Sequence, residues 1–217
     1  MFKAKDKNGV DVIGKKYVPA CTTVGSGNIF VGKARCKFVK EATQTISDVI
    51  ATGAKAYTGK PLVSTQPFGE VISLVTEAGE TSAVTITGHD YLGQKMVEQI
   101  TLNGTTAVSG HKAFKDIESM TTAANVTKDV DMATVSVVGL PFTAVSKDFV
   151  VKNGAADATA AVTAGAFTQT ATSNDPRGVL SIAHASTGDE LDCVYNTTDF
   201  VNASGNGGLF GVPHYAG

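Results

Sequence analysis

The sequence predicts an all-β protein: an antiparallel β-sandwich, Ig-like or jelly-roll-like, with an extended N-terminal arm. Short stretches of alternating apolar and polar residues recur from residue 70 onward, as in half-buried strands. Turn signals separate them at intervals of about 8–12 residues, which is typical of sandwiches and barrels. Half-apolar sheets must cover one another, so we expect two packed layers. The predicted divisions are an irregular arm over 1–66, the sandwich over 67–204 and a Gly-rich tail over 205–217.

The composition argues against several classes of partner. Charged residues make up 18% of the 217 residues, below the roughly 25% of ordinary soluble domains, and the formal net charge is −2. The chain has no Lys/Arg stripe or basic tail, so we expect no nucleic-acid partner. No stretch approaches the roughly 18 apolar residues of a membrane span, and the polar start lacks the apolar segment of a signal peptide. We therefore expect no membrane partner.

The first 66 residues are punctuated by glycines, which disfavour helices. Within this region, residues 28–39 can form one strand. Residues 41–51 place Ile46, Val49 and Ile50 at helical spacing and are the best helix candidate. Their Thr and Ile content makes a strand nearly as favourable. The composition of the whole region suits an arm that becomes ordered on assembly.

The rest of the chain predicts a succession of strands. A loop with a Gly at each end is expected over 88–93, and Asn103-Gly104 is a strong hairpin signal because both residues tolerate positive φ. The Ala/Thr-rich residues 155–172 favour a strand or an exposed hairpin over a weak helix. The tail is expected to be disordered or to dock on a partner. The expected strands are residues 70–76, 82–87, 94–102, 113–122 and 131–138, and residues 142–151 are expected to hold another strand or two.

The pair His89-Asp90, within GHDYLG at residues 88–93, is the first candidate for chemistry. Adjacent residues of a strand face opposite ways, so a catalytic dyad would need further partners from elsewhere. No G-x-S-x-G nucleophile elbow is present. The favoured interpretation is a structural loop in which Asp90 caps the turn through its own backbone.

The remaining candidates lack the spacing that their chemistry requires. The other histidines show no H-x-x-x-H or H-x-H pattern, and the acidic pairs lack the full calcium-loop spacing. Gly25-Ser26-Gly27 is not followed by the Lys-Ser/Thr of a phosphate loop. We therefore predict no catalytic, cofactor-binding or metal-ligating residue, no cofactor and no small-molecule substrate. The residues considered are His111, His184, His214, Asp129, Asp131, Asp189, Glu190 and Asp192.

The three cysteines, Cys21, Cys36 and Cys193, are odd in number and include no C-x-x-C pair. We expect reduced thiols in a protein made in a reducing cytoplasm, rather than a disulfide framework or a zinc site. Without a signal peptide, the Asn-x-Ser/Thr patterns are interpreted as chance. They begin at Asn103, Asn125, Asn196 and Asn202.

Residues 83–121, AVTITGHDYLGQKMVEQITLNGTTAVSGHKAFKDIESMT, resemble a segment common in structural proteins of tailed-bacteriophage virions. The shared pattern is a Thr-rich strand, a Gly-x-Asp-x-x-Gly loop, a strand that carries Glu and ends in Leu-Asn-Gly, a turn, and a KAF strand. VVGLPF at 137–142 and DPRGVLSI at 175–182 resemble further pieces of such proteins in the same order. The family includes capsid decoration (cement) proteins, head fibres and tail components.

The resemblance implies a virion structural protein, and the leading hypothesis among its classes is a capsid decoration protein that stabilises the shell by protein–protein contacts. The implied partners are the major capsid protein and copies of the chain itself, with a homotrimer as the expected state. The implied location is the capsid surface of a virion assembled in the host cytoplasm. The alternatives are a tail, head–tail or head-fibre component, and a carbohydrate-binding adhesin module, which the absence of Trp weakens. An enzyme is not expected, because no nucleophile, base and orienting group can be assembled from motifs.

Overall fold

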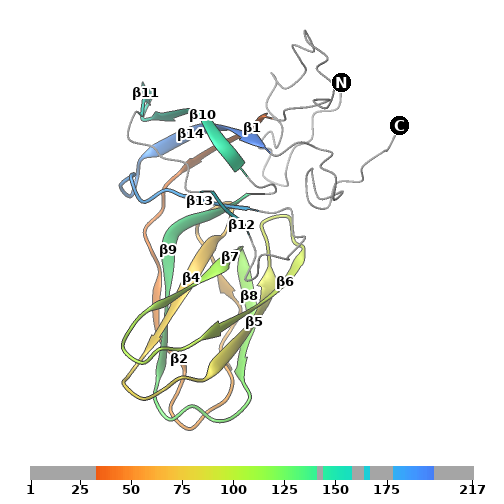
Figure 1. The fold of residues 1–217 in the computed structure, drawn as a ribbon, viewed down its shortest axis with the longest axis vertical. Helices are drawn as coiled ribbons and strands as arrows, with labels where there is room; N and C mark the ends of the chain where they lie inside the picture. Colours follow the sequence, from red (N-terminus) through yellow and green to blue (C-terminus); the bar gives the residue numbers. More distant parts are fainter. Residues whose placement is uncertain (1–32, 141–143, 158–163, 167–177, 198–217) are drawn as a thin grey trace, which may run out of the picture. The chain divides into compact units, whose positions relative to one another are not determined.

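The computed structural model describes residues 33–140, 144–157, 164–166 and 178–197 (Figure 1). The chain divides into two compact units: Glu41–Gly139 forms one, and the residues up to Lys40 and from Leu140 onward form the other. The described residues form strands, turns and loops, which confirms the predicted all-β class. In these ranges no helix is long and apolar enough to cross a membrane.

The unit Glu41–Gly139 is a two-layer antiparallel sandwich built from eight strands. Within it, one sheet has the order β2-β9-β4-β7 and the other β3-β8-β5-β6. When the eight strands are counted from β2, the first, eighth, third and sixth lie in this order in one sheet. This is the strand order of a jelly roll. The strands are β2 (Thr45–Ile50), β3 (Leu62–Val63), β4 (Glu70–Thr76), β5 (Ala83–His89), β6 (Lys95–Thr101), β7 (Val108–Phe114), β8 (Asp116–Thr122) and β9 (Val130–Leu140).

Period-two alternation places the core of this sandwich. Val84 and Ile86 on β5 are buried, as are Met96 and Ile100 on β6, while the residues between them are more exposed. Successive side chains of a strand point to opposite faces, so each strand gives one face to the core. Burying one aliphatic side chain of this size stabilises the fold by about 1.5–3 kcal/mol. The same alternation that predicted the strands therefore also selects their buried residues.

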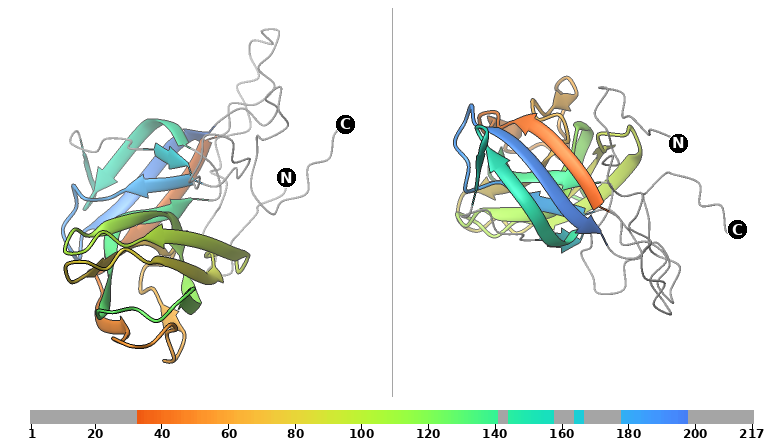
Figure 2. Two further views of the ribbon diagram at one scale, coloured as in Figure 1. Left: turned by 60° about the horizontal axis from the view of Figure 1, so that its bottom comes forward. Right: turned by 90° about the horizontal axis from the view of Figure 1, so that it is seen from above.

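The second unit contains a sheet of order β1-β14-β10-β11 and the pair β12-β13, all antiparallel. The right-hand view of Figure 2 shows β1 (orange), β14 (blue) and β10 (teal) side by side. The buried Lys40 follows β1 directly and donates from Nζ to the carbonyl oxygens of Ile182 (3.2 Å) and Ala185 (2.5 Å). The strands are β1 (Lys33–Val39), β10 (Ala144–Lys152), β11 (Ala155–Ala156), β12 (Ala164–Ala166), β13 (Gly178–Ser181) and β14 (Glu190–Thr197).

The predicted irregular arm over 1–66 is wrong for residues 33–66, which supply β1, β2 and β3. Within residues 41–51, Thr45–Ile50 adopts the strand alternative: Ile46 of β2 is paired with Met132 of β9, and Val49 and Ile50 are buried. Pairing with a strand more than 80 residues away along the chain, together with this burial, overrides the local helical spacing. Residues 1–32 and the predicted tail at 205–217 lie outside the described residues, as does most of 155–172.

The single sandwich predicted over residues 67–204 is instead divided between the two units. The jelly roll begins before residue 67, since β2 and β3 belong to it, and it ends at Gly139. The strand expected over 142–151 corresponds to β10 and belongs to the second unit. The sequence carries a turn signal at Gly139-Leu140-Pro141, of the same kind that separates neighbouring strands elsewhere, so it did not distinguish this boundary between units from an ordinary strand end.

Asn103-Gly104 forms the expected tight turn but not the expected hairpin. The Thr106 amide donates to the Asn103 carbonyl oxygen at 3.0 Å, and Gly104 has a φ of 53°. The strands on either side, β6 and β7, belong to different sheets. The Gly104 amide instead donates to the Glu80 carbonyl oxygen, and its own carbonyl oxygen accepts from the Thr76 amide. Local residue types thus determine the turn, whereas the strand partners are determined by contacts with β4 and β5.

Candidate functional site

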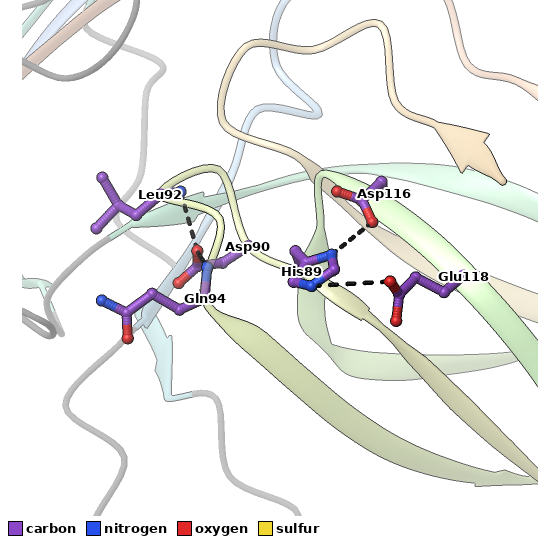
Figure 3. A network of polar contacts seen from close by, with 6 residues as sticks. All are labelled: His89, Asp90, Leu92, Gln94, Asp116 and Glu118. Carbon is purple, nitrogen blue, oxygen red and sulfur yellow. Dashed lines mark hydrogen bonds and ion pairs between the residues drawn. The ribbon is translucent and has the colours of Figure 1, made fainter.

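His89 ends β5 and lies opposite Asp116 at the start of β8 (Figure 3). Its Nδ1 is 2.8 Å from Asp116 Oδ1, and its Nε2 is 4.0 Å from Glu118 Oε1. The hydrogen bond with Asp116 raises the pKa of His89 above its usual value, because it favours the charged imidazolium. All three side chains are partly exposed, so the group is a surface charge cluster.

Asp90 turns away from this cluster and into the loop (Figure 3). Its Oδ1 accepts hydrogen bonds from the backbone amides of Leu92 (2.9 Å) and Gln94 (2.8 Å). The carboxylate is buried, and Gly93 completes the turn with a φ of 80°. The expected capping role of Asp90 is confirmed, although the loop begins at Asp90 because Gly88 and His89 belong to β5.

Sequence reasoning missed Asp116 and Glu118 as the partners of His89. They lie 27 and more residues further along the chain and are brought to β5 by the pairing with β8. The register shifts between Thr87 and Gly88, so that Glu118 is an extra residue on β8 at this point. No local signal in the sequence indicates such a shift, because it is a property of the two strands together.

The outward side of β5, β6 and β8 is rich in hydroxyl groups, and we name it the threonine face. Thr85 is paired with Gln99 and Thr121, and in the next row Thr87 is paired with Val97 and Ser119. Directly opposite residues share one face of a sheet, so these rows form one surface. Val97 is 49% exposed, which is unusual for a large aliphatic residue in the described part of the chain. The threonine face consists of Thr85, Thr87, Val97, Gln99, Thr101, Ser119 and Thr121, and the ionisable residues of these strands adjoin it at one end.

A pocket of about 170 Å³ opens between the two sheets of the jelly roll, beside β2 and β3. Its walls include Leu62 and Met132, and its polar lining includes Ser64 and Glu70. The Ser64 hydroxyl donates to Glu70 Oε2 at 2.9 Å. The volume is below the roughly 300–1,000 Å³ of typical small-molecule sites. The pocket therefore gives no basis for assigning a substrate.

The other candidate residues of the sequence stand in separate places. His111 is exposed on β7, and His184 in the second unit has its Nε2 3.2 Å from Asp157 Oδ2. Three aspartates stabilise loops by accepting backbone hydrogen bonds: Asp129 from Thr52, Asp131 from Asp48, and Asp189 from Ser186. His214 lies outside the described residues. Among the residues that the structure describes, no group of three or more His, Cys, Asp or Glu side chains is placed to hold a metal ion.

Comparison of the chain with models of known protein families, with curated proteins and with solved structures finds no match. The class that the structure defines is therefore a topological one, a jelly-roll sandwich joined to a second all-β unit.

Proposed function

We propose that the chain is a structural virion protein that decorates and stabilises the capsid of a tailed bacteriophage. One observation carries this proposal: residues 83–121, which resemble virion proteins, form four consecutive strands, β5 to β8, of a jelly roll. Jelly rolls are used by viral capsid proteins, and also by lectins and cupins. Because a fold by itself does not specify a function, the sequence resemblance supports the choice among these classes.

The proposed partners are the major capsid protein and further copies of the chain, arranged as a homotrimer. The threonine face suits such contacts, because burying hydroxyl groups and Val97 against a partner costs less desolvation energy than burying unpaired charges. Hydroxyl groups also both donate and accept hydrogen bonds, so they can adapt to a polar protein surface. The ionisable residues His89, Lys95, Asp116 and Glu118 lie together at one end of this face, where β5 pairs with its neighbours.

Mass spectrometry of virions from the phage that encodes the chain tests the proposal, together with a density map of the particle. The expected result is a copy number comparable to that of the major capsid protein, with the chain on the head surface. Density confined to the tail or the head–tail junction would establish the runner-up function instead. Absence of the chain from purified virions would refute both.

Charge substitution on the threonine face tests the proposed contact surface. Thr101→Glu and Thr121→Glu place a carboxylate among the exposed hydroxyl groups, whereas Thr58→Glu does so at an exposed loop position of the same unit. The first two variants should bind capsids about tenfold or more weakly in co-sedimentation, because each would bury an unpaired charge. Thr58→Glu should bind like the wild type, and circular dichroism should show that all three variants fold. Equal binding of all three variants would exclude this face, and selective binding on a glycan array would favour the adhesin alternative.

A further inference from the structure

Two of the three cysteines lie directly opposite each other in the second unit. Cys36 on β1 and Cys193 on β14 are Cα partners in an antiparallel register that continues without interruption from Lys33 to Val39. Directly opposite residues of such a pair share one face of the sheet, with Cα atoms about 4.5–5.5 Å apart. Disulfides span Cα distances of about 4.4–6.8 Å. The backbone therefore already has the spacing that a disulfide between these residues needs.

We infer that Cys36 and Cys193 form a cross-strand disulfide site that closes when the folded protein meets an oxidising medium. The inference does not depend on the proposed function, and it agrees with synthesis of the thiol form in a reducing cytoplasm. Cys193 is fully buried on the central strand β14, which pairs with β10 on its other side. Among the described strands, β1 stands at the end of this sheet, so its local opening gives an oxidant access to the pair.

The oxidant is a low-molecular-weight disulfide, such as oxidised glutathione. One cysteine thiolate attacks a sulfur atom of the donor, forms a mixed disulfide and releases one donor thiolate. The second cysteine thiolate then attacks the protein sulfur atom of the mixed disulfide and releases the other donor thiolate. The protein loses two electrons and two protons, and the donor gains both, giving two reduced thiols. The new bond fixes β1 to β14 and closes a loop from residue 36 to residue 193, which restricts the unfolded chain.

Peptide mapping after oxidation is the direct test. The reduced full-length protein is incubated with oxidised glutathione under native conditions, and the remaining thiols are then alkylated. The intact mass before alkylation should fall by about 2 Da, the mass of the two hydrogen atoms lost. Trypsin without reduction should release one linked species that joins Cys36-Lys37 to the peptide of residues 178–217, while Cys21 becomes alkylated. A bridge to Cys21, stable glutathione adducts without a bridge, an intermolecular bridge, or no reaction would each overturn the inference.

Stability measurements with matched variants provide a second test. Oxidation should raise the melting temperature of the wild type and of Cys21→Ala by about 5 °C or more, and dithiothreitol should reverse the rise. Cys36→Ala should show no rise. This variant is preferred to one at Cys193, because an alanine at a fully buried position can destabilise the fold through the cavity it leaves. The assigned pair would be contradicted if oxidation raised the melting temperature of Cys36→Ala as much as that of the wild type. It would also be contradicted if oxidation did not raise the melting temperature of Cys21→Ala.

Discussion

The carboxylate of Glu98 on β6 binds the backbone of His111 on β7, across the gap between the two sheets of the jelly roll. Oε1 accepts from the His111 amide at 2.6 Å, and the other oxygen, Oε2, accepts from the Lys112 amide at 3.3 Å. The pairing of β7 with β4 is irregular at this point, with a register shift between Val71 and Ser73. The buried Glu98 side chain therefore satisfies amides that the irregular segment of β7 presents at the sheet edge.

Removing this carboxylate should destabilise the jelly roll. Glu98→Ala leaves the two amides without their acceptor, and we expect a loss of about 2–4 kcal/mol in the free energy of unfolding. Glu98→Gln retains one acceptor oxygen and removes the buried charge, so its loss should be smaller, about 1 kcal/mol. Urea denaturation of the three proteins measures both values. A loss for Glu98→Gln as large as that for Glu98→Ala would show that the negative charge, and not the acceptor oxygen, is required.

The contribution of Glu98 to the stability of the wild type should depend on pH, and the direction of this dependence follows from its pKa. Burial raises the pKa of Glu98 above its usual value of 4.5, in spite of the hydrogen bonds from His111 and Lys112. Its stabilising contribution is therefore fully present below the usual pKa and is lost as the pH rises through the raised value. Relative to Glu98→Gln, the wild type should be more stable at about pH 4 than at about pH 7. An unchanged difference between the two proteins would mean that Glu98 titrates normally.

Gly110 should be energetically coupled to Glu98. A Cβ atom at Gly110 would lie 2.6 Å from Glu98 Oε2, closer than real Cβ contacts allow. Gly110→Ala must therefore displace the carboxylate, and we expect a cost of about 1–3 kcal/mol. In the Glu98→Ala background the added methyl group meets no carboxylate, so its cost should be much smaller. A double-mutant cycle by urea denaturation measures the coupling, and additive effects would show that Gly110 is needed for another reason.

Glu80 should make the fold sensitive to acid. Hydrogen bonds from the Ser82 side chain and the Thr127 backbone lower its pKa from 4.5 to about 2. A lowered pKa stabilises the fold above the usual value, and this contribution is lost as the pH falls toward 2. The melting temperature of the wild type should therefore fall more steeply between about pH 5 and pH 2 than that of Glu80→Gln. Equal slopes for the wild type and Glu80→Gln would contradict the role assigned to these hydrogen bonds.

His89 should titrate above its usual range because of Asp116. The imidazolium–carboxylate pair contributes stability below the usual pKa of 6.5, and this is lost as the pH rises through the raised value. The pair is partly exposed, so His89→Ala should fold and lose no more than about 1 kcal/mol. NMR titration of the imidazole should show a lower midpoint in Asp116→Asn. Glu118→Gln should have a smaller effect, since its carboxylate is 4.0 Å from the ring, and equal effects would contradict the assigned geometry.

The local features of the chain were accessible from the sequence. Alternation of apolar and polar residues determines that β5 and β6 are strands and that Val84, Ile86 and Met96 face the core. The turn at Asn103-Gly104 and the capping role of Asp90 also follow from residue types within a few positions. These features depend on backbone preferences and on hydrogen bonds between near neighbours, which a short stretch of sequence contains in full.

The tertiary structure decided which strands meet, and the candidate sites depend on that. Thr45–Ile50, within the region that was also a helix candidate, becomes β2 because β9 pairs with it, and His89 acquires Asp116 because β8 lies beside β5. Glu98 contacts His111, and Cys36 is paired in register with Cys193, for the same reason. Strands with the same alternation of apolar and polar residues look alike in the sequence, and the alternation does not show which strand pairs with which. The sequence alone therefore could not distinguish the jelly-roll strand order from an Ig-like one. The selection is made by the summed burial and pairing of residues that lie far apart along the chain.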